Sequence, residues 1–409
     1  MTGRTPDEVP WRTQGAVYGI GLFSTSIFHM AAVVVPLYVS TLDVAPAVLG
    51  VVFAAPHFLP LLFSIHAGSL MDRLGARRVM VVCTLIGALT PLFYPAVSWV
   101  WALVACQMFF GFSESMGWLG AQTMIGQYMH GRTSYAGRMS FIIRFGHLVA
   151  PPMAGAMWDV AGPWGAFGIM SVWASGSVVC ALLLPPKAGG AATGEHAGRG
   201  GIRALLPRPS DYFDAFRLLG APAVAVVVIL GGTMHIGNAV QSSFYPLWLK
   251  DMGITGTAIG TLISISSIGA AFFSLLTARA TRYVPSFWVL LLSLWAGIVL
   301  ISVTPLLGSY VVLAVALFLR SGANGLAQPL VITLVLRGAG SARQGKAIGL
   351  RGTANRIASI ISPILMGALV QALGLEKGFY AIGALASLVM AALGIFLWCR
   401  PDVARSGED

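Results

Sequence analysis

The segment QGAVYGIGLFSTSIFHMAAVVVPLYVS, residues 14–40, decides the fold of this chain. It contains no Asp, Glu, Lys or Arg, and it is longer than the about 20 apolar residues that a helix needs to cross a bilayer. Because lipid offers backbone amides no hydrogen-bond partner, such a run predicts a membrane-spanning helix. It is also too long for a cleaved signal peptide, so we expect this first helix to be retained.

The composition extends this prediction to the whole chain of 409 residues. Hydrophobic residues make up 57% and charged residues 10%, and the mean hydropathy is +0.82, which argues against a water-soluble enzyme. The net charge of +11 indicates no nucleic-acid partner, because the charges fall mostly in short loops. No phosphate-binding, metal-binding or nucleophile motif occurs, so we expect no ATP hydrolysis, no metal and no cofactor. We expect free thiols at the four cysteines, Cys83, Cys106, Cys180 and Cys399.

Apolar runs predict an all-α membrane protein of twelve transmembrane helices in two six-helix halves. The N-terminal bundle, 14–185, has predicted spans at 14–40, 47–70, 78–97, 99–125, 139–158 and 164–185. The C-terminal bundle, 222–398, has predicted spans at 222–249, 257–279, 286–307, 309–336, 347–373 and 377–398. A polar central loop at 186–221 separates the bundles, and an N-terminus at 1–13 and a tail at 399–409 complete the chain.

The placement of charge predicts the orientation of these helices. Twenty of the 25 basic residues fall in connections on one side, against Lys250 and Lys377 on the other. By the positive-inside rule, both termini and the central loop lie in the cytoplasm. We therefore expect a multi-pass protein of the plasma membrane, and the arginine-rich basic set favours a bacterial inner membrane.

The two halves are related by an internal repeat. A shift of about 210 to 212 positions superposes Pro36-Leu37 on Pro246-Leu247, Gly50 on Gly260, Gly137 on Gly349, Arg144 on Arg356, Pro151 on Pro363, Gly155 on Gly367 and Phe167 on Phe379. Because six helices per half leave both halves the same way up, we expect parallel repeats with a ligand site between them near the midplane.

The connection between the second and third predicted spans reads GSLMDRLGARRV, residues 68–79. It resembles the signature loop of the major facilitator superfamily, G-x-L-x-D-R-x-G-R-R, although Ala76 stands where a basic residue is usual and Arg78 follows one place later. The resemblance implies a cytoplasmic gating loop that latches the outward-facing state, made by Gly68, Asp72, Arg73, Gly75, Arg77 and Arg78. Its glycines suit a tight turn, and its charges suit helix ends and lipid phosphates.

The fifth predicted span carries RFGHLVAPPMAG, in which Gly146, Ala150, Pro151 and Gly155 resemble the antiporter motif of that superfamily. In the family this motif is associated with export. A second family motif is missing, because Gln107 precedes Gly111 where the family has an arginine. The pattern is thus closest to proton-coupled exporters, without matching the typical drug exporters.

Four charged residues are predicted to lie at membrane depth. Glu114 is the only carboxylate at membrane depth, and Arg144, Arg320 and Arg356 are the cations. A charge at the bilayer centre costs roughly 2.5 to 3.5 kcal/mol on insertion scales, so it needs a partner, water or a role. We expect Glu114 to couple protons and the arginines to bind an anionic substrate group, while a structural ion pair or snorkelling arginines remain the alternative.

Further polar residues lie on the first and seventh predicted spans. His29, His235, Asn238 and Gln241 are candidate substrate-binding residues, and polar packing within the bundle explains them equally well. His57 and His147 could also titrate near neutral pH, although a membrane histidine is more often an interhelical hydrogen-bonding residue.

These features predict a secondary transporter that works by alternating access, not an enzyme. We expect a monomer that exports a small organic solute, such as an anionic metabolite, siderophore or drug, in exchange for protons. One alternative is a proton-coupled uptake symporter for a carboxylate-type metabolite. A further alternative is a non-transporting assembly factor or a membrane-bound enzyme on the same scaffold.

Overall fold

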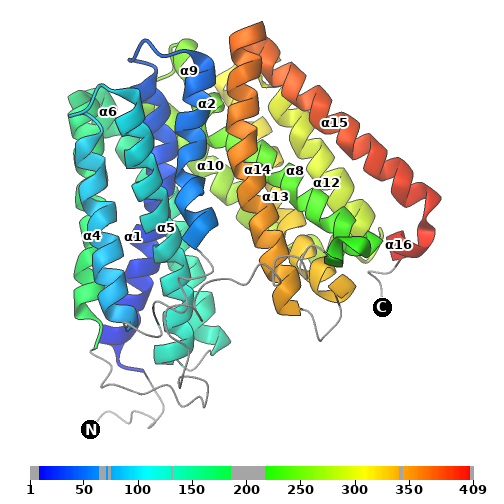
Figure 1. Cartoon of the computed structure of the whole chain (residues 1–409), viewed down its shortest axis with the longest axis horizontal. Coiled ribbons are helices and arrows are strands. Elements are labelled where there is room, and N and C mark those ends of the chain that lie inside the picture. Colours follow the sequence, from blue (N-terminus) through cyan, green and yellow to red (C-terminus); the bar gives the residue numbers. More distant parts are fainter. Residues whose placement is uncertain are drawn as a thin grey trace. The chain divides into compact units, whose positions relative to one another are not determined.

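The computed structural model describes residues 9–63, 71, 75–129, 132–185, 217–339 and 344–405, and these residues form helices with no strand among them. The elements are α1 (Trp11–Val39), α2 (Pro46–Ala54), η1 (Ala55–His57), α4 (Ala76–Phe93), α5 (Val100–Met129), α6 (Thr133–Leu183), η3 (Arg217–Gly220), α8 (Pro222–Ser242), α9 (Phe244–Asp251), α10 (Gly256–Ser274), α11 (Thr277–Ala280), α12 (Ser286–Ser302), η4 (Thr304–Leu306), α13 (Tyr310–Ala339), α14 (Gln344–Leu373), α15 (Leu375–Cys399) and α16 (Pro401–Arg405) (Figure 1). The all-helical fold class is confirmed.

Nine helical segments among the described residues are long and apolar enough to cross a membrane, and Ser286–Ser302 is a shorter apolar helix. One of the nine, Ser134–Leu183, contains two predicted spans. The backbone of α6 leaves helical geometry at Gly162, whose φ of 62° lies in the left-handed region that glycine adopts without a Cβ clash. Every predicted span overlaps helical residues, and the crossing of the membrane by all twelve stays a prediction.

The chain divides into two compact units. Unit 1 comprises Met1–Val35 and Ala55–Pro207, and unit 2 comprises Pro36–Ala54 and Arg208–Asp409. Unit 2 therefore includes a segment from the first two predicted spans. The reason is local packing, because α2 lies against α14 (Figure 1).

The contact of α2 with α14 depends on two glycines. A Cβ added at Gly50 would lie 2.4 Å from the carbonyl oxygen of Pro363, and one added at Gly367 would lie 2.6 Å from that of Pro46. Both obstacles are backbone atoms, which cannot move aside as a flexible side chain can. Glycine therefore lets these helices approach to a distance that no other residue permits, as in close helix pairs of membrane proteins.

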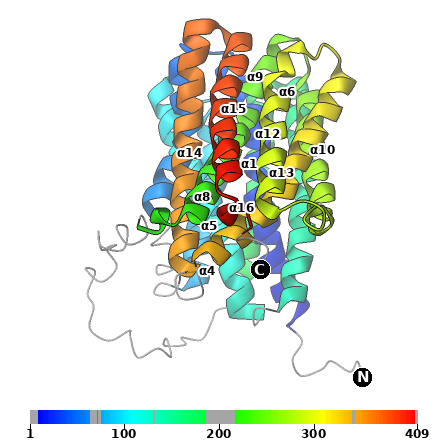
Figure 2. The same cartoon turned by 90° about the vertical axis from the view of Figure 1, so that its right-hand side faces the viewer.

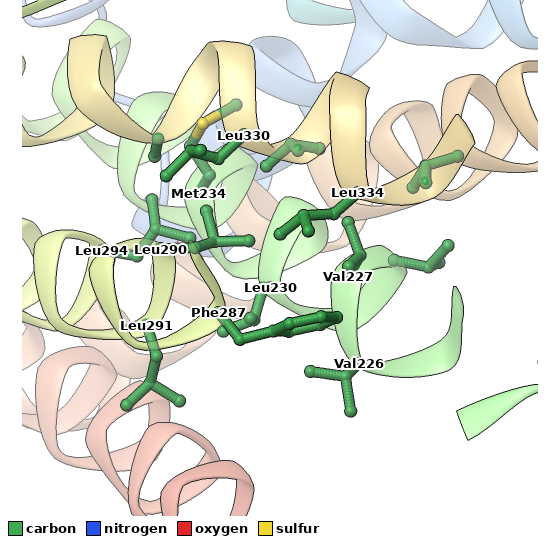
Figure 3. Close-up of a cluster of buried hydrophobic side chains, with 14 of the residues drawn as sticks. Val226, Val227, Leu230, Met234, Phe287, Leu290, Leu291, Leu294, Leu330 and Leu334 are labelled. Atoms are coloured by element: carbon green, nitrogen blue, oxygen red, sulfur yellow. The ribbon is translucent and has the colours of Figure 1, made fainter. Parts of the chain in front are cut away.

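The core of unit 2 is apolar and close-packed. Leu230 and Met234 of α8, Phe287 and Leu290 of α12, and Leu330 of α13 meet in one cluster of buried side chains (Figure 3). Helix α15 packs against α12 and α14, and Figure 2 shows it beside α14. This core fixes α8 and α13, the helices that carry Asn238 and Arg320.

The predicted span 222–249 is not one continuous helix. The helix stops at Ser243, whose φ and ψ of −121° and −75° are not helical, and α9 starts at Phe244. Proline explains the break, because Pro246 has no N–H to donate and its ring would clash with the carbonyl of Ser242. The side chains after the break therefore do not point in the directions that a continuation of α8 would give them.

Candidate functional site

Unit 2 contains a buried arginine, Arg320, two of whose nitrogen donors have no hydrogen-bond partner among the described residues. Arg320 lies in the middle of α13 and is 2% exposed. Its Nε and Nη1 atoms have no hydrogen-bond partner among the described residues. A Cβ added at Gly237 of α8 would lie 3.0 Å from Nη2, so a glycine makes room for the guanidinium group. The result is a desolvated cation with free N–H groups.

Polar side chains of three helices lie near this arginine. Asn324, one turn further along α13, donates from Nδ2 to Oδ1 of Asn238 on α8 at 2.8 Å. Tyr245 of α9 is 1% exposed and lies close enough to Arg320 for an electrostatic interaction. Tyr245 is the second residue after the helix break at Ser243. We call Arg320, Asn324, Asn238 and Tyr245 the arginine cluster.

A second polar contact joins α8 to α14. The Oγ of Ser359 and Nδ1 of His235 are 3.3 Å apart. One turn before Ser359, Oδ1 of Asn355 is buried without a hydrogen-bond partner among the described residues. Arg356 is half-buried and interacts electrostatically with His235. The described part of unit 2 thus offers unsatisfied donors at Arg320 and an unsatisfied acceptor at Asn355.

Unit 1 contains a stacked pair of imidazoles. His29 of α1 and His147 of α6 have ring centroids 3.9 Å apart and planes inclined by 26°. Nε2 of His147 is 3.2 Å from Oγ1 of Thr25, and Nδ1 of His29 is 3.4 Å from the carbonyl oxygen of Thr25. One threonine therefore anchors both rings.

The polar contacts of the two units repeat at the offset found in the sequence. A shift of about 210 to 212 positions carries Thr25 onto His235 and His147 onto Ser359. Both pairs are imidazole–hydroxyl contacts, with the partners exchanged between the two helices. The same shift carries the approach of Gly21 to Ile143 onto that of Gly231 to Asn355. These matching contacts support the predicted duplication.

The remaining charged candidates lie on separate elements. Glu114 lies in α5 of unit 1 with a half-buried side chain, and Arg144 lies in α6 of the same unit with an exposed side chain. Arg320 and Arg356 both belong to unit 2. Gln241 is half-buried near the end of α8, and the structure does not place it in the arginine cluster.

The signature loop is described in part. Gly68, Asp72 and Arg73 lie outside the described residues. Gly75 has a φ of 87° and begins α4, which explains the glycine at this turn. Nη2 of Arg77 donates to the carbonyl oxygen of Leu182, at the last turn of α6, at 2.8 Å. Cationic groups stabilise helix C-termini in this way, while Arg78 is exposed.

The antiporter-like motif forms a tight helix contact inside unit 1. A Cβ added at Gly146 would lie 2.5 Å from Cδ1 of Leu22 on α1, so this glycine brings the two helices together. Ala150, Pro151 and Gly155 are buried. The motif thereby positions His147, the residue next to Gly146, beside α1.

Sequence reasoning missed several residues of these clusters. Tyr245 and Asn355 carried no signal by themselves, whereas Asn324 is four residues from Arg320 and so shares its helix face. Thr25 stands in the same relation to His29. Among the described residues no group of three or more His, Cys, Asp or Glu could hold a metal ion.

Many secondary transporters are built from two repeated helical units with polar residues buried between their helices. The sequence model of the Major Facilitator Superfamily matches residues 17–340 and 227–408, and the chain belongs to this superfamily. It is therefore a transporter and not an enzyme.

Individual relatives are distant. The chain is 24% identical over 382 residues to the quinolone resistance protein NorA of Staphylococcus aureus (strain MSSA476), covering 88% of this chain and 90% of that protein. It resembles the crystal structure of the nucleoside transporter NupG with a TM-score of 0.75 and 17% identity, over 94% and 98% of the two chains. It resembles that of a D-xylose–proton symporter with a TM-score of 0.63 and 15% identity, over 92% and 96%. At these identities the structures indicate the shared fold alone.

Proposed function

We propose that the protein exports a small organic anion across the bacterial plasma membrane by alternating access, in exchange for protons. Both termini lie in the cytoplasm in this proposal, and the protein works as a monomer. The observation that carries it is the buried Arg320 with two unsatisfied donors. The proposal assigns anion binding to Arg320 and proton binding to Glu114.

The energetics of Arg320 favour a ligand that carries negative charge. A buried donor without a partner costs about 1–3 kcal/mol, and more when the group is charged. A carboxylate, phosphate or sulfonate would accept from two guanidinium N–H groups at once, in the geometry that arginine presents and lysine does not. The arginine cluster then becomes satisfied when the solute binds.

The second unsatisfied group narrows the class of solute. Asn355 has a buried carbonyl oxygen that can accept a hydrogen bond. A solute with an amine, amide or hydroxyl donor in addition to its anionic group would satisfy both residues. The helix break before Tyr245 supports a site in this region, since discontinuous helices line the solute sites of many transporters.

Export is favoured by two observations. The relative found by sequence is named as a quinolone resistance protein, and the Gly146 motif resembles the antiporter motif. Uptake by symport uses the same fold, as the D-xylose–proton symporter illustrates. The direction of proton movement distinguishes these two functions. The enzyme and assembly-factor alternatives are set aside, because the superfamily consists of transporters.

Flux measurements in proteoliposomes test this proposal. Purified protein is reconstituted, a pH gradient is imposed, and the flux of a quinolone with a carboxylate and an amine is compared with that of a neutral nucleoside. We expect quinolone movement opposite to proton movement, with loss of flux in Arg320→Gln and in Glu114→Gln. Arg282→Gln is the matched control, because Arg282 is exposed. Co-directional movement would identify a symporter, and unchanged flux in Arg320→Gln would refute the anion site.

A further inference from the structure

The stacked imidazoles of unit 1 are held in one arrangement by both helices. Gly146 lets α6 approach α1, and His147 thereby reaches His29. Thr25 of α1 contacts one nitrogen of each ring, through its hydroxyl to His147 and through its carbonyl to His29. The pair is thus a fixed constellation of two titratable groups.

The hydrogen bonds of Thr25 determine which nitrogens carry hydrogen. Its hydroxyl donates its single proton to the carbonyl oxygen of Gly21 at 2.7 Å, so Oγ1 acts as an acceptor toward His147. Nε2 of His147 must then be the donor, and its Nδ1 carries the lone pair. The Thr25 carbonyl can only accept, so Nδ1 of His29 is protonated and its Nε2 carries the lone pair. Each neutral ring keeps one nitrogen to receive a proton.

The surroundings limit the pair to a single added proton. Two imidazolium rings about 4 Å apart repel each other enough to disfavour the second proton about a thousandfold at an effective dielectric constant of about 20. Arg144 of α6 also acts electrostatically on His147 and adds to this repulsion. The ring of Phe28 lies beside that of His29 and also beside that of a third imidazole, His57.

We propose that His29 and His147 form one proton-binding site, which takes up a single proton at Nε2 of His29 or at Nδ1 of His147. Binding forms one N–H bond and changes the charge of the pair from zero to one. The site is additional to Glu114. Only its role in transport rests on the proposed function, because the geometry alone predicts proton binding.

Proton counting on the full-length protein tests this directly. Protein with ¹⁵N-labelled histidine is placed in lipid nanodiscs and titrated from about pH 9 to about pH 4, the range in which histidine charges. Relative to the double variant His29→Gln/His147→Gln, we expect the wild-type pair to take up one proton. Each single variant should also take up one. Uptake of two protons by the wild-type pair, or of none, would overturn the proposal.

The tautomers provide a test that needs no change to either ring. In the wild-type spectrum at high pH, Nε2 of His147 and Nδ1 of His29 should be the protonated nitrogens. Thr25→Ser keeps the acceptor and should keep this pattern, whereas Thr25→Val removes it and should release His147 to either tautomer. A bare Nε2 on His147 in the wild type would contradict the assignment.

Flux measurements separate this proposal from the proposed function. If the pair couples protons, the double variant His29→Gln/His147→Gln, which has lost the site, should reduce the response of quinolone flux to the pH gradient. Absence of quinolone flux in the wild type would refute the proposed solute and leave the proton count to decide the site. An unchanged pH response in the double variant His29→Gln/His147→Gln would overturn the role of the pair in transport and leave it as a proton-binding site that does not drive flux.

Discussion

Replacement of Arg320 by methionine should stabilise the protein without solute and abolish its stabilisation by solute. Methionine fills a similar elongated volume with no polar group, so the variant removes two unsatisfied buried donors at once. At about 1–3 kcal/mol each, their removal should raise the free energy of unfolding by about 2–6 kcal/mol, less what is lost in packing. Such a gain corresponds to a rise in Tm of several degrees.

Thermal unfolding followed by intrinsic fluorescence in detergent measures both effects. A solute at about one hundred times its Kd should stabilise the wild type by about 2.7 kcal/mol and leave the Arg320→Met variant unchanged. Arg282→Met controls for the loss of one positive charge at an exposed position and should change neither value. A Tm for Arg320→Met several degrees below that of the wild type, in the absence of solute, would refute the reasoning, because it would mean that the guanidinium has compensating partners.

Two glycine substitutions, each paired with a control, should distinguish effects on solute binding from effects on helix packing. Gly237→Ala is paired with Gly232→Ala, and Gly50→Ala is paired with Gly352→Ala. Gly237→Ala puts a methyl group 3.0 Å from the guanidinium of Arg320 and should weaken solute binding severalfold, measured by the solute-dependent change in Tm. Gly232→Ala, whose nearest neighbour would be 3.9 Å away, should bind like the wild type, and equal weakening in both would contradict a specific effect. Gly50→Ala forces a methyl group against a carbonyl oxygen of α14 and should destabilise the protein by about 1–3 kcal/mol. Gly352→Ala meets no atom within 4 Å and should be neutral or stabilising in the same unfolding measurement.

The sequence predicted the parts of this molecule that depend on local composition. Apolar runs located the helices, because a membrane helix must satisfy its backbone within its own segment. Arg320 was found for the same reason, since a charge inside such a run stands out. Gly75, predicted to lie in a turn, has a φ of 87° just before α4, a backbone conformation that favours glycine.

The parts that depend on contacts between helices could not be predicted. The span 222–249 was predicted as one helix, and the signal for its break, Pro246, is also common in continuous membrane helices. The stacking of His29 on His147 joins residues far apart in the sequence, and nothing local to either residue indicates the other. The unsatisfied state of Asn355 likewise depends on which groups its neighbours present.

The duplication explains why only one unit has a pair of imidazoles. In both units the first helix contacts the fifth through an imidazole and a hydroxyl, and an arginine of the fifth helix, Arg144 or Arg356, acts electrostatically on that imidazole. The position equivalent to His29 is Ala239 in unit 2, so His235 there has no second ring beside it at that position. His235 is therefore a single titratable group, in which protonation is not limited by a stacked neighbour. Unit 1 thus has a pair of stacked imidazoles, whereas unit 2 has a single imidazole two residues before Gly237, the glycine that accommodates the buried arginine. The same helix presents Asn238 to Asn324. Proton binding and anion binding are accordingly assigned to different repeats, which is how a duplicated scaffold can acquire two ligands without either site having to bind both.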